Sequence, residues 1–213
     1  MSVAAMKARL KRDAEKYPES TRIRLHRALS WLARAERETT DHDAAFVFLW
    51  IAFNAAYAKE FGQGANERQR LSEFITMLLA VDHDQVLQAI VFKQFSGPIR
   101  TLLDNKFVFE PFWRAMREHD SSNQWETSFK ASHKAALASI MQSGTATLLS
   151  IVFDRLYVLR NQLVHGGATW NSSVNRAQVK DGVRILSAVV PAILGLMLEC
   201  PDIDFGDVLY PVV

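Results

Sequence analysis

The side chains with the clearest chemical potential lie in one short segment, Arg160-Asn161-Gln-Leu-Val-His165-Gly166-Gly167. Arginine presents a forked set of donors that matches phosphate oxygens, and histidine is the side chain best suited to move a proton near neutral pH. Asn161 and His165 are four residues apart and therefore share a face of a helix. In principle, this guanidinium and imidazole are enough to cleave RNA without a metal. The imidazole would act as base on the ribose 2′-hydroxyl or as acid on the leaving oxygen, and the guanidinium would stabilise charge on the phosphate.

The spacing of this pair is not distinctive by itself. Arginine followed five positions later by histidine occurs three times, as Arg37/His42, Arg114/His119 and Arg160/His165. The first pair spans a Thr-Thr-Asp break and the second ends a mixed helix. Only the third lies at the end of an apolar helix, carries Asn directly after Arg and is followed by Gly-Gly. These surroundings select Arg160, Asn161 and His165 as the catalytic candidates.

The elements that must position these residues are all expected to be helices. The 213-residue chain has only 9 Gly and 6 Pro, 49% of its residues are hydrophobic, and no segment alternates convincingly between apolar and polar residues. Apolar residues at helical spacing predict helices at 19–38, 43–60, 67–80, 84–95, 99–104, 110–118, 124–142, 145–165 and 174–198. The predicted fold class is therefore all-α, a helical bundle formed by one domain over residues 1–213.

Two of these helices frame the motif. The 43–60 segment is apolar nearly all round, which predicts a central helix, and Asn54 is its one interior polar residue. A Thr-Thr-Asp break precedes it, with Asp41 or Asp43 as the N-cap. For Asn54 two interpretations stay open: a buried amide satisfied by backbone, or a contact that orients Arg160 or His165.

Composition limits the remaining chemistry. One Cys excludes a disulfide framework and a Cys-rich zinc site, and the six His residues lack the carboxylate partners of a strong metal site. No phosphate-loop, dinucleotide or zinc-protease motif occurs, so neither a cofactor nor a metal is expected. The longest apolar stretches, 44–53 and 185–198, are shorter than the roughly 18–20 residues of a membrane span. We expect a cytoplasmic protein without a membrane segment.

Positive charge is concentrated at the start of the chain. Residues 1–40 hold ten Lys or Arg and five Asp or Glu, whereas residues 41–213 hold fifteen and eighteen. Arg22, Arg24 and Arg27 could widen an RNA footprint. Solvated charge on an exposed helix face is the alternative for all three.

The segment from Phe153 to Gly167 resembles the HEPN (higher eukaryotes and prokaryotes nucleotide-binding) superfamily, whose hallmark is Arg, a polar residue that is often Asn, three to five further positions, and His. The stretch Ala45 to Tyr57 resembles the second helix of the abortive-infection-like bacterial branch. The likeness covers about 20–60 and 145–198, and implies a four-helix core with helices inserted at about 65–145.

The resemblance also implies a function. Many members of the superfamily are metal-independent endoribonucleases of toxin–antitoxin, phage-defence or RNA-processing systems. They pair about a two-fold axis, so that the motifs of both copies face one cleft. RNA, a second copy and an antitoxin protein are thus the implied partners. Members paired with a nucleotidyltransferase antitoxin commonly carry Tyr two residues after the His; Gly167 stands there in this chain, which argues against that regulation.

Each catalytic interpretation has a purely structural alternative. His165 could serve only as a cation at a helix C-terminus, and Tyr157, three residues before Arg160, could pack rather than touch RNA. The alternative for the whole chain is a non-catalytic helical module that binds a nucleotide, RNA or a protein.

Overall fold

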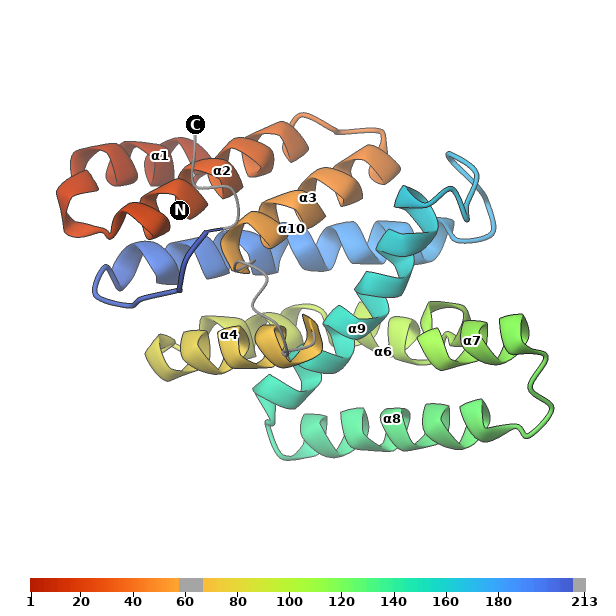
Figure 1. Ribbon diagram of the computed structural model, residues 1–213. Helices are drawn as coiled ribbons and strands as arrows, with labels where there is room; N and C mark the ends of the chain where they lie inside the picture. The colour runs from red at the N-terminus through yellow and green to blue at the C-terminus, as the bar shows by residue number, and fades with distance from the viewer. Residues whose placement is uncertain (58–66, 209–213) are drawn as a thin grey trace.

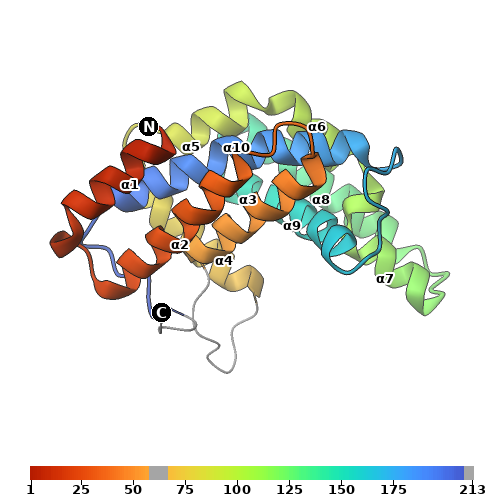
Figure 2. The same cartoon turned by 90° about the horizontal axis from the view of Figure 1, so that it is seen from above.

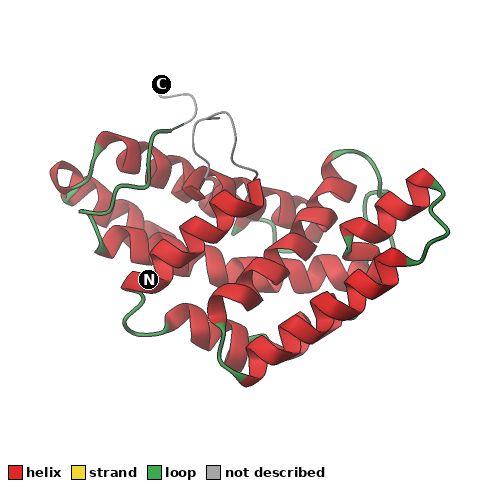
Figure 3. Ribbon diagram, turned by 60° about the horizontal axis from the view of Figure 1, so that its bottom comes forward, coloured by secondary structure: helices red, strands yellow, loops and turns green. Residues whose placement is uncertain are grey.

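The computed structural model describes residues 1–57 and 67–208, without the side chains of Glu67 and Arg68. Within these ranges the chain is built from helices and connecting loops and holds no strand (Figure 3). The predicted all-α fold class is confirmed. The last part of the predicted 43–60 helix and its expected end at 61–64 lie outside the described residues.

The helix bounds follow the periodicity closely. The α-helices are α1 (Val3–Arg12), α2 (Glu19–Ala35), α3 (His42–Tyr57), α4 (Glu67–Val81), α5 (Val86–Ala89), α6 (Ser96–Leu103), α7 (Glu110–Glu118), α8 (Gln124–Met141), α9 (Thr145–Val164) and α10 (Arg176–Glu199). Helix α1 was not predicted, and within the predicted segments the largest difference falls at 84–95. Only α5 is α-helical there, and the wider π turn Ile90–Gln94 continues it.

The helices form two layers, which are joined by α9 and by direct contacts of α10 with α4, α5 and α6. Helices α1, α2, α3 and α10 lie side by side in one layer, and α4, α6, α7 and α8 lie in the other (Figures 1 and 2). Helix α9 crosses between them and contacts α3 and α10 on one side and α4, α6 and α8 on the other. The four helices that the sequence predicts as the core, α2, α3, α9 and α10, therefore pack together. The helices of the predicted 65–145 insertion cover the other side of α9.

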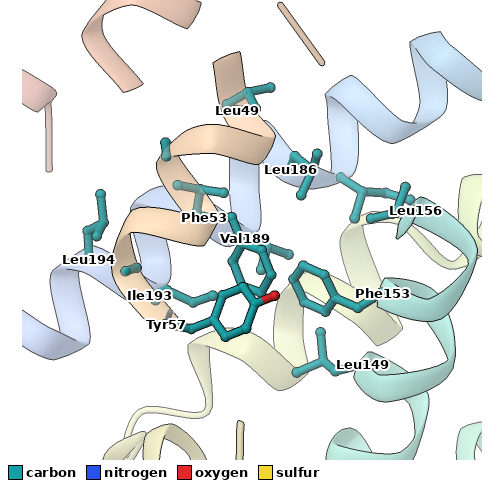
Figure 4. Packing of buried hydrophobic residues seen from close by; sticks show 14 of the residues in the cluster. Leu49, Phe53, Tyr57, Leu149, Phe153, Leu156, Leu186, Val189, Ile193 and Leu194 are labelled. Carbon is teal, nitrogen blue, oxygen red and sulfur yellow. The ribbon is translucent and has the colours of Figure 1, made fainter. Parts of the chain in front are cut away.

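Aromatic rings fill the contact between α3 and α9. The rings of Phe53 and Phe153 stack with centroids 4.2 Å apart, and Tyr57 lies 4.7 Å from Phe53 (Figure 4). Trp50 completes the cluster at 6.5 Å from Phe153. All four residues are buried, which fixes how α9 crosses the bundle.

Helix α10 passes close to α3 and α9 at Gly182. A Cβ atom at this position would lie 2.7 Å from Phe46 Cε2 and 3.2 Å from Leu156 Cδ2. The absence of a side chain therefore lets α10 sit directly on α3 and α9.

By length and composition alone, α10 could cross a membrane, although 56% of its most apolar window is buried inside the protein. Taken together, segments Gln69–Val81 and Val86–Gln94 are also long and apolar enough to cross a membrane, but the chain bends by 111° between them. In α10 the apolar residues pack against α2, α3 and α9, as expected for a core helix.

Candidate active site

The motif occupies the last turn of α9, where the buried crossing helix reaches solvent. Arg160 and Asn161 are half-buried, and Nη1 of Arg160 donates a 2.9 Å hydrogen bond to Oδ1 of Asn161. The guanidinium carbon lies 6.0 Å from the Tyr157 ring centre, one turn earlier. Asn161 and Tyr157 thus restrict the guanidinium on two sides.

His165 is the C-cap of α9 and is exposed. Its backbone N–H donates to the Asn161 carbonyl at 3.0 Å, and Gly166 then takes a left-handed conformation with φ of 71°. Only glycine adopts this conformation without strain, so the Gly-Gly pair ends the helix as predicted. Within the described part of the chain, the imidazole has no hydrogen bond or ion pair, which leaves both ring nitrogens accessible to a ligand.

The loop after His165 is anchored to the start of α3. Nη2 of Arg176 donates to both oxygens of the buried Asp43 carboxylate, at 2.7 and 3.0 Å. Oδ2 of Asp43 also accepts from the Asn171 backbone N–H at 2.8 Å. These contacts hold the 165–175 loop next to α3.

Asp41, rather than Asp43, is the side-chain cap of α3. Its Oδ1 accepts from the Ala44 backbone N–H at 3.0 Å, and its Oδ2 accepts from the Trp170 indole at 3.0 Å. The bond from the Ala44 N–H is the main reason that the pKa of Asp41 lies below its ordinary value, and the indole bond lowers it further. The cap therefore also ties the loop after the motif to α3.

The structure places the three catalytic candidates at one helix end but does not join them all. Arg160 is bonded to Asn161, whereas no hydrogen bond links either residue's side chain to His165. The Arg160 Nε is buried and has no partner among the described residues. One copy of the chain therefore presents a guanidinium and an imidazole at the same helix end without coupling them.

The structure bears on the two interpretations left open for Tyr157, packing or contact with RNA, and for Asn54, a bond to backbone or to the motif. Tyr157 packs, with its ring 6.1 Å from Trp50, and it also borders a cavity of about 260 Å³ between α3 and α9. The Asn54 Oδ1 is buried without a partner in the described chain, so the backbone does not satisfy it. Asn54 also makes no hydrogen bond to Arg160 or His165. Its neighbour Phe53 stacks on Phe153, and Phe153 lies about two helical turns before Arg160 in α9.

The prediction that Arg24 belongs to a surface for RNA is wrong. Arg24 is fully buried, and its guanidinium donates to the carbonyls of Ala56 (3.4 Å), Gly206 (3.0 Å) and Asp207 (2.7 Å). Burial lowers the pKa of Arg24 to about 10, so the group is still charged at neutral pH. Arg24 ties the C-terminal segment to α2 and α3.

Arg22 is exposed and Arg27 half-buried, and both remain on the surface. Both belong to α2, whose N-terminus lies at the opposite end of the bundle from the C-terminus of α9 (Figures 1 and 2). Within one copy they do not extend the candidate site.

Sequence reasoning missed a second buried arginine, Arg155. Its guanidinium lies between the rings of Phe109 (4.2 Å) and Phe129 (5.1 Å), and burial lowers its pKa to about 10. Its place on the apolar stripe of α9, between Val152 and Leu159, was the available signal. Arg155 fastens the α7–α8 region to the helix that carries the motif.

Among the described residues, no group of three His, Cys, Asp or Glu side chains is arranged to hold a metal ion. Comparisons of the chain with protein-family models, with curated proteins and with solved structures found no match.

Proposed function

We propose that this protein is an endoribonuclease that needs no metal and cuts RNA at a composite site made by Arg160 and His165 of two copies. One observation carries the proposal: a partly buried guanidinium and an exposed imidazole, which has no partner among the described residues, lie at the same solvent-facing end of α9. This pair has the two functions that phosphodiester cleavage by the ribose requires, proton transfer and stabilisation of phosphate charge.

In the proposed reaction, one His165 removes the proton from the ribose 2′-hydroxyl, and the oxygen attacks the adjacent phosphorus. The bond from phosphorus to the 5′-oxygen breaks, and the second His165 donates a proton to that oxygen. The products are a 2′,3′-cyclic phosphate and a 5′-hydroxyl. Arg160, held by Asn161, donates hydrogen bonds to the phosphate oxygens as charge develops on them.

Two features support pairing of two copies. The reaction uses one base and one acid, and each chain offers one histidine at this helix end; a two-fold axis brings equivalent residues together. The end of α9 and the loop that follows it also expose three large apolar side chains, with Val164 47%, Trp170 71% and Val174 87% exposed. Burial of such a patch between two copies would be favourable.

Incubation of the purified protein with total RNA in the presence of EDTA tests the proposal. We expect cleavage with cyclic-phosphate ends, and a loss of at least about a hundredfold in rate for His165→Ala or Arg160→Ala, because each removes a group that acts in the transition state. Circular dichroism and light scattering should show unchanged helicity and dimerisation.

The chain offers a matched control in Arg114 and His119, which have the same spacing and are both exposed. The double variant Arg114→Ala/His119→Ala should cleave at the wild-type rate. Cleavage that survives His165→Ala, or that occurs only with added divalent metal, would overturn the proposal. Binding of RNA without cleavage would favour the non-catalytic module.

A further inference from the structure

A groove that the proposed reaction does not use runs between α1 and α2. Its volume is about 640 Å³, and it is lined by Lys7, Leu10, Lys11, Ala14, Glu19, Arg22, Ile23, His26, Arg27, Leu29 and Ser30. The size is typical of binding clefts, which range over roughly 300–1,000 Å³. Helix α1 and the first part of α2, which line the groove, lie at the opposite end of the bundle from the C-terminus of α9 (Figures 1 and 2).

The groove has an apolar floor and a basic rim. Leu10 and Ile23 are half-buried, whereas Lys7, Lys11 and Arg22 are exposed. The nearby carboxylate of Asp13 is already engaged by Arg12 at 2.8 Å and Lys16 at 3.0 Å, so it does not neutralise the rim.

Lys7, Lys11 and Arg22 have no ion pair within the described chain, and Glu19 is the one acidic residue that lines the groove. Three cations around aliphatic side chains form a surface that is complementary to a ligand with an apolar face and negative edges.

We propose that this groove binds an acidic amphipathic helix of a partner protein. The partner's apolar residues would lie on Leu10 and Ile23, and its carboxylates would meet Lys7, Lys11 and Arg22. Helices commonly bind in grooves of this kind, and charge complementarity sets their specificity. The two walls, α1 and α2, would form a three-helix contact with the incoming helix.

Two other occupants fit less well. Single-stranded nucleic acid binds through aromatic platforms for its bases, and the lining includes no Phe, Tyr or Trp beside its aliphatic floor. A second copy that paired symmetrically through this groove would bring two basic rims together, which is unfavourable.

A designed helical peptide tests the inference, with leucine at positions i, i+3, i+4 and i+7 and glutamate elsewhere. Binding is measured by fluorescence anisotropy at low salt. We expect saturable binding that Lys7→Glu/Lys11→Glu/Arg22→Glu weakens by about tenfold, and that rising salt also weakens. A photoreactive group on the leucine face should cross-link to α1 and α2.

The matched control is Lys93→Glu/Arg100→Glu/Lys134→Glu, which reverses three exposed charges outside the groove and should leave binding unchanged. The same peptide with lysine for glutamate should not bind. Equal weakening by both triple variants, equal binding of the lysine peptide, or cross-links elsewhere would overturn the inference. Displacement of the peptide from the His165→Ala protein by single-stranded RNA at equal concentration would assign the groove to RNA instead. None of these readouts depends on RNA cleavage.

Discussion

At the scale of single residues, arginines only two positions apart on α2 differ completely in environment. Arg22 is exposed, whereas Arg24 is buried and supplies donors to three backbone carbonyls. We expect Arg24→Met to lower the free energy of unfolding by about 2–3 kcal/mol, because one buried and two partly buried hydrogen bonds to carbonyls lose their charged donor. Arg22→Met should change it by less than about 0.5 kcal/mol. Urea denaturation of both variants checks this, and equal midpoints would contradict the structural role of Arg24.

At the scale of elements, the close approach of α10 to α3 and α9 depends on Gly182. A methyl group there would lie 2.7 Å from Phe46, so Gly182→Ala should destabilise the protein by about 1–3 kcal/mol. Gly195 lies in the same helix, and a methyl group at that position would meet nothing within 4 Å. Gly195→Ala should therefore be neutral or stabilising by up to about 1 kcal/mol. Thermal unfolding distinguishes the two variants. If Gly182→Ala were as stable as wild type, the packing of α10 on α3 and α9 would not depend on the absence of a side chain at this position.

At the scale of the whole molecule, the proposed site is complete only in a pair of chains. Val164 at the end of α9 and Val174 in the loop that follows are exposed, so Val164→Glu/Val174→Glu should place repelling charges in the interface. We expect a folded monomer with RNA cleavage reduced by at least about a hundredfold, since neither copy alone supplies both base and acid. Light scattering reports the mass and circular dichroism the fold. A monomer that cleaves at the wild-type rate would contradict the composite site. Leu137→Glu and Met141→Glu, at exposed apolar positions of α8, provide the control.

Helix positions were largely predictable because they depend on local periodicity. The predicted 110–118 helix matches α7, and 145–165 differs from α9 by one residue. The left-handed Gly166 that ends α9 was also indicated by its residue type. In the predicted 84–95 helix the same periodicity did not reveal the π turn at Ile90–Gln94, because the apolar spacing over so few residues does not distinguish it from an α-helical turn.

By itself, the sequence determined the all-α class and placed Arg160, Asn161 and His165 at one helix end, since both follow from residue types and their spacing along one helix. Only the tertiary structure separated Arg24 from Arg22 and chose Asp41 over Asp43 as the cap. These outcomes depend on groups distant in the chain, such as the Gly206 and Asp207 carbonyls and the Arg176 guanidinium. A polar side chain is buried where such partners satisfy it, and local patterns do not contain those partners.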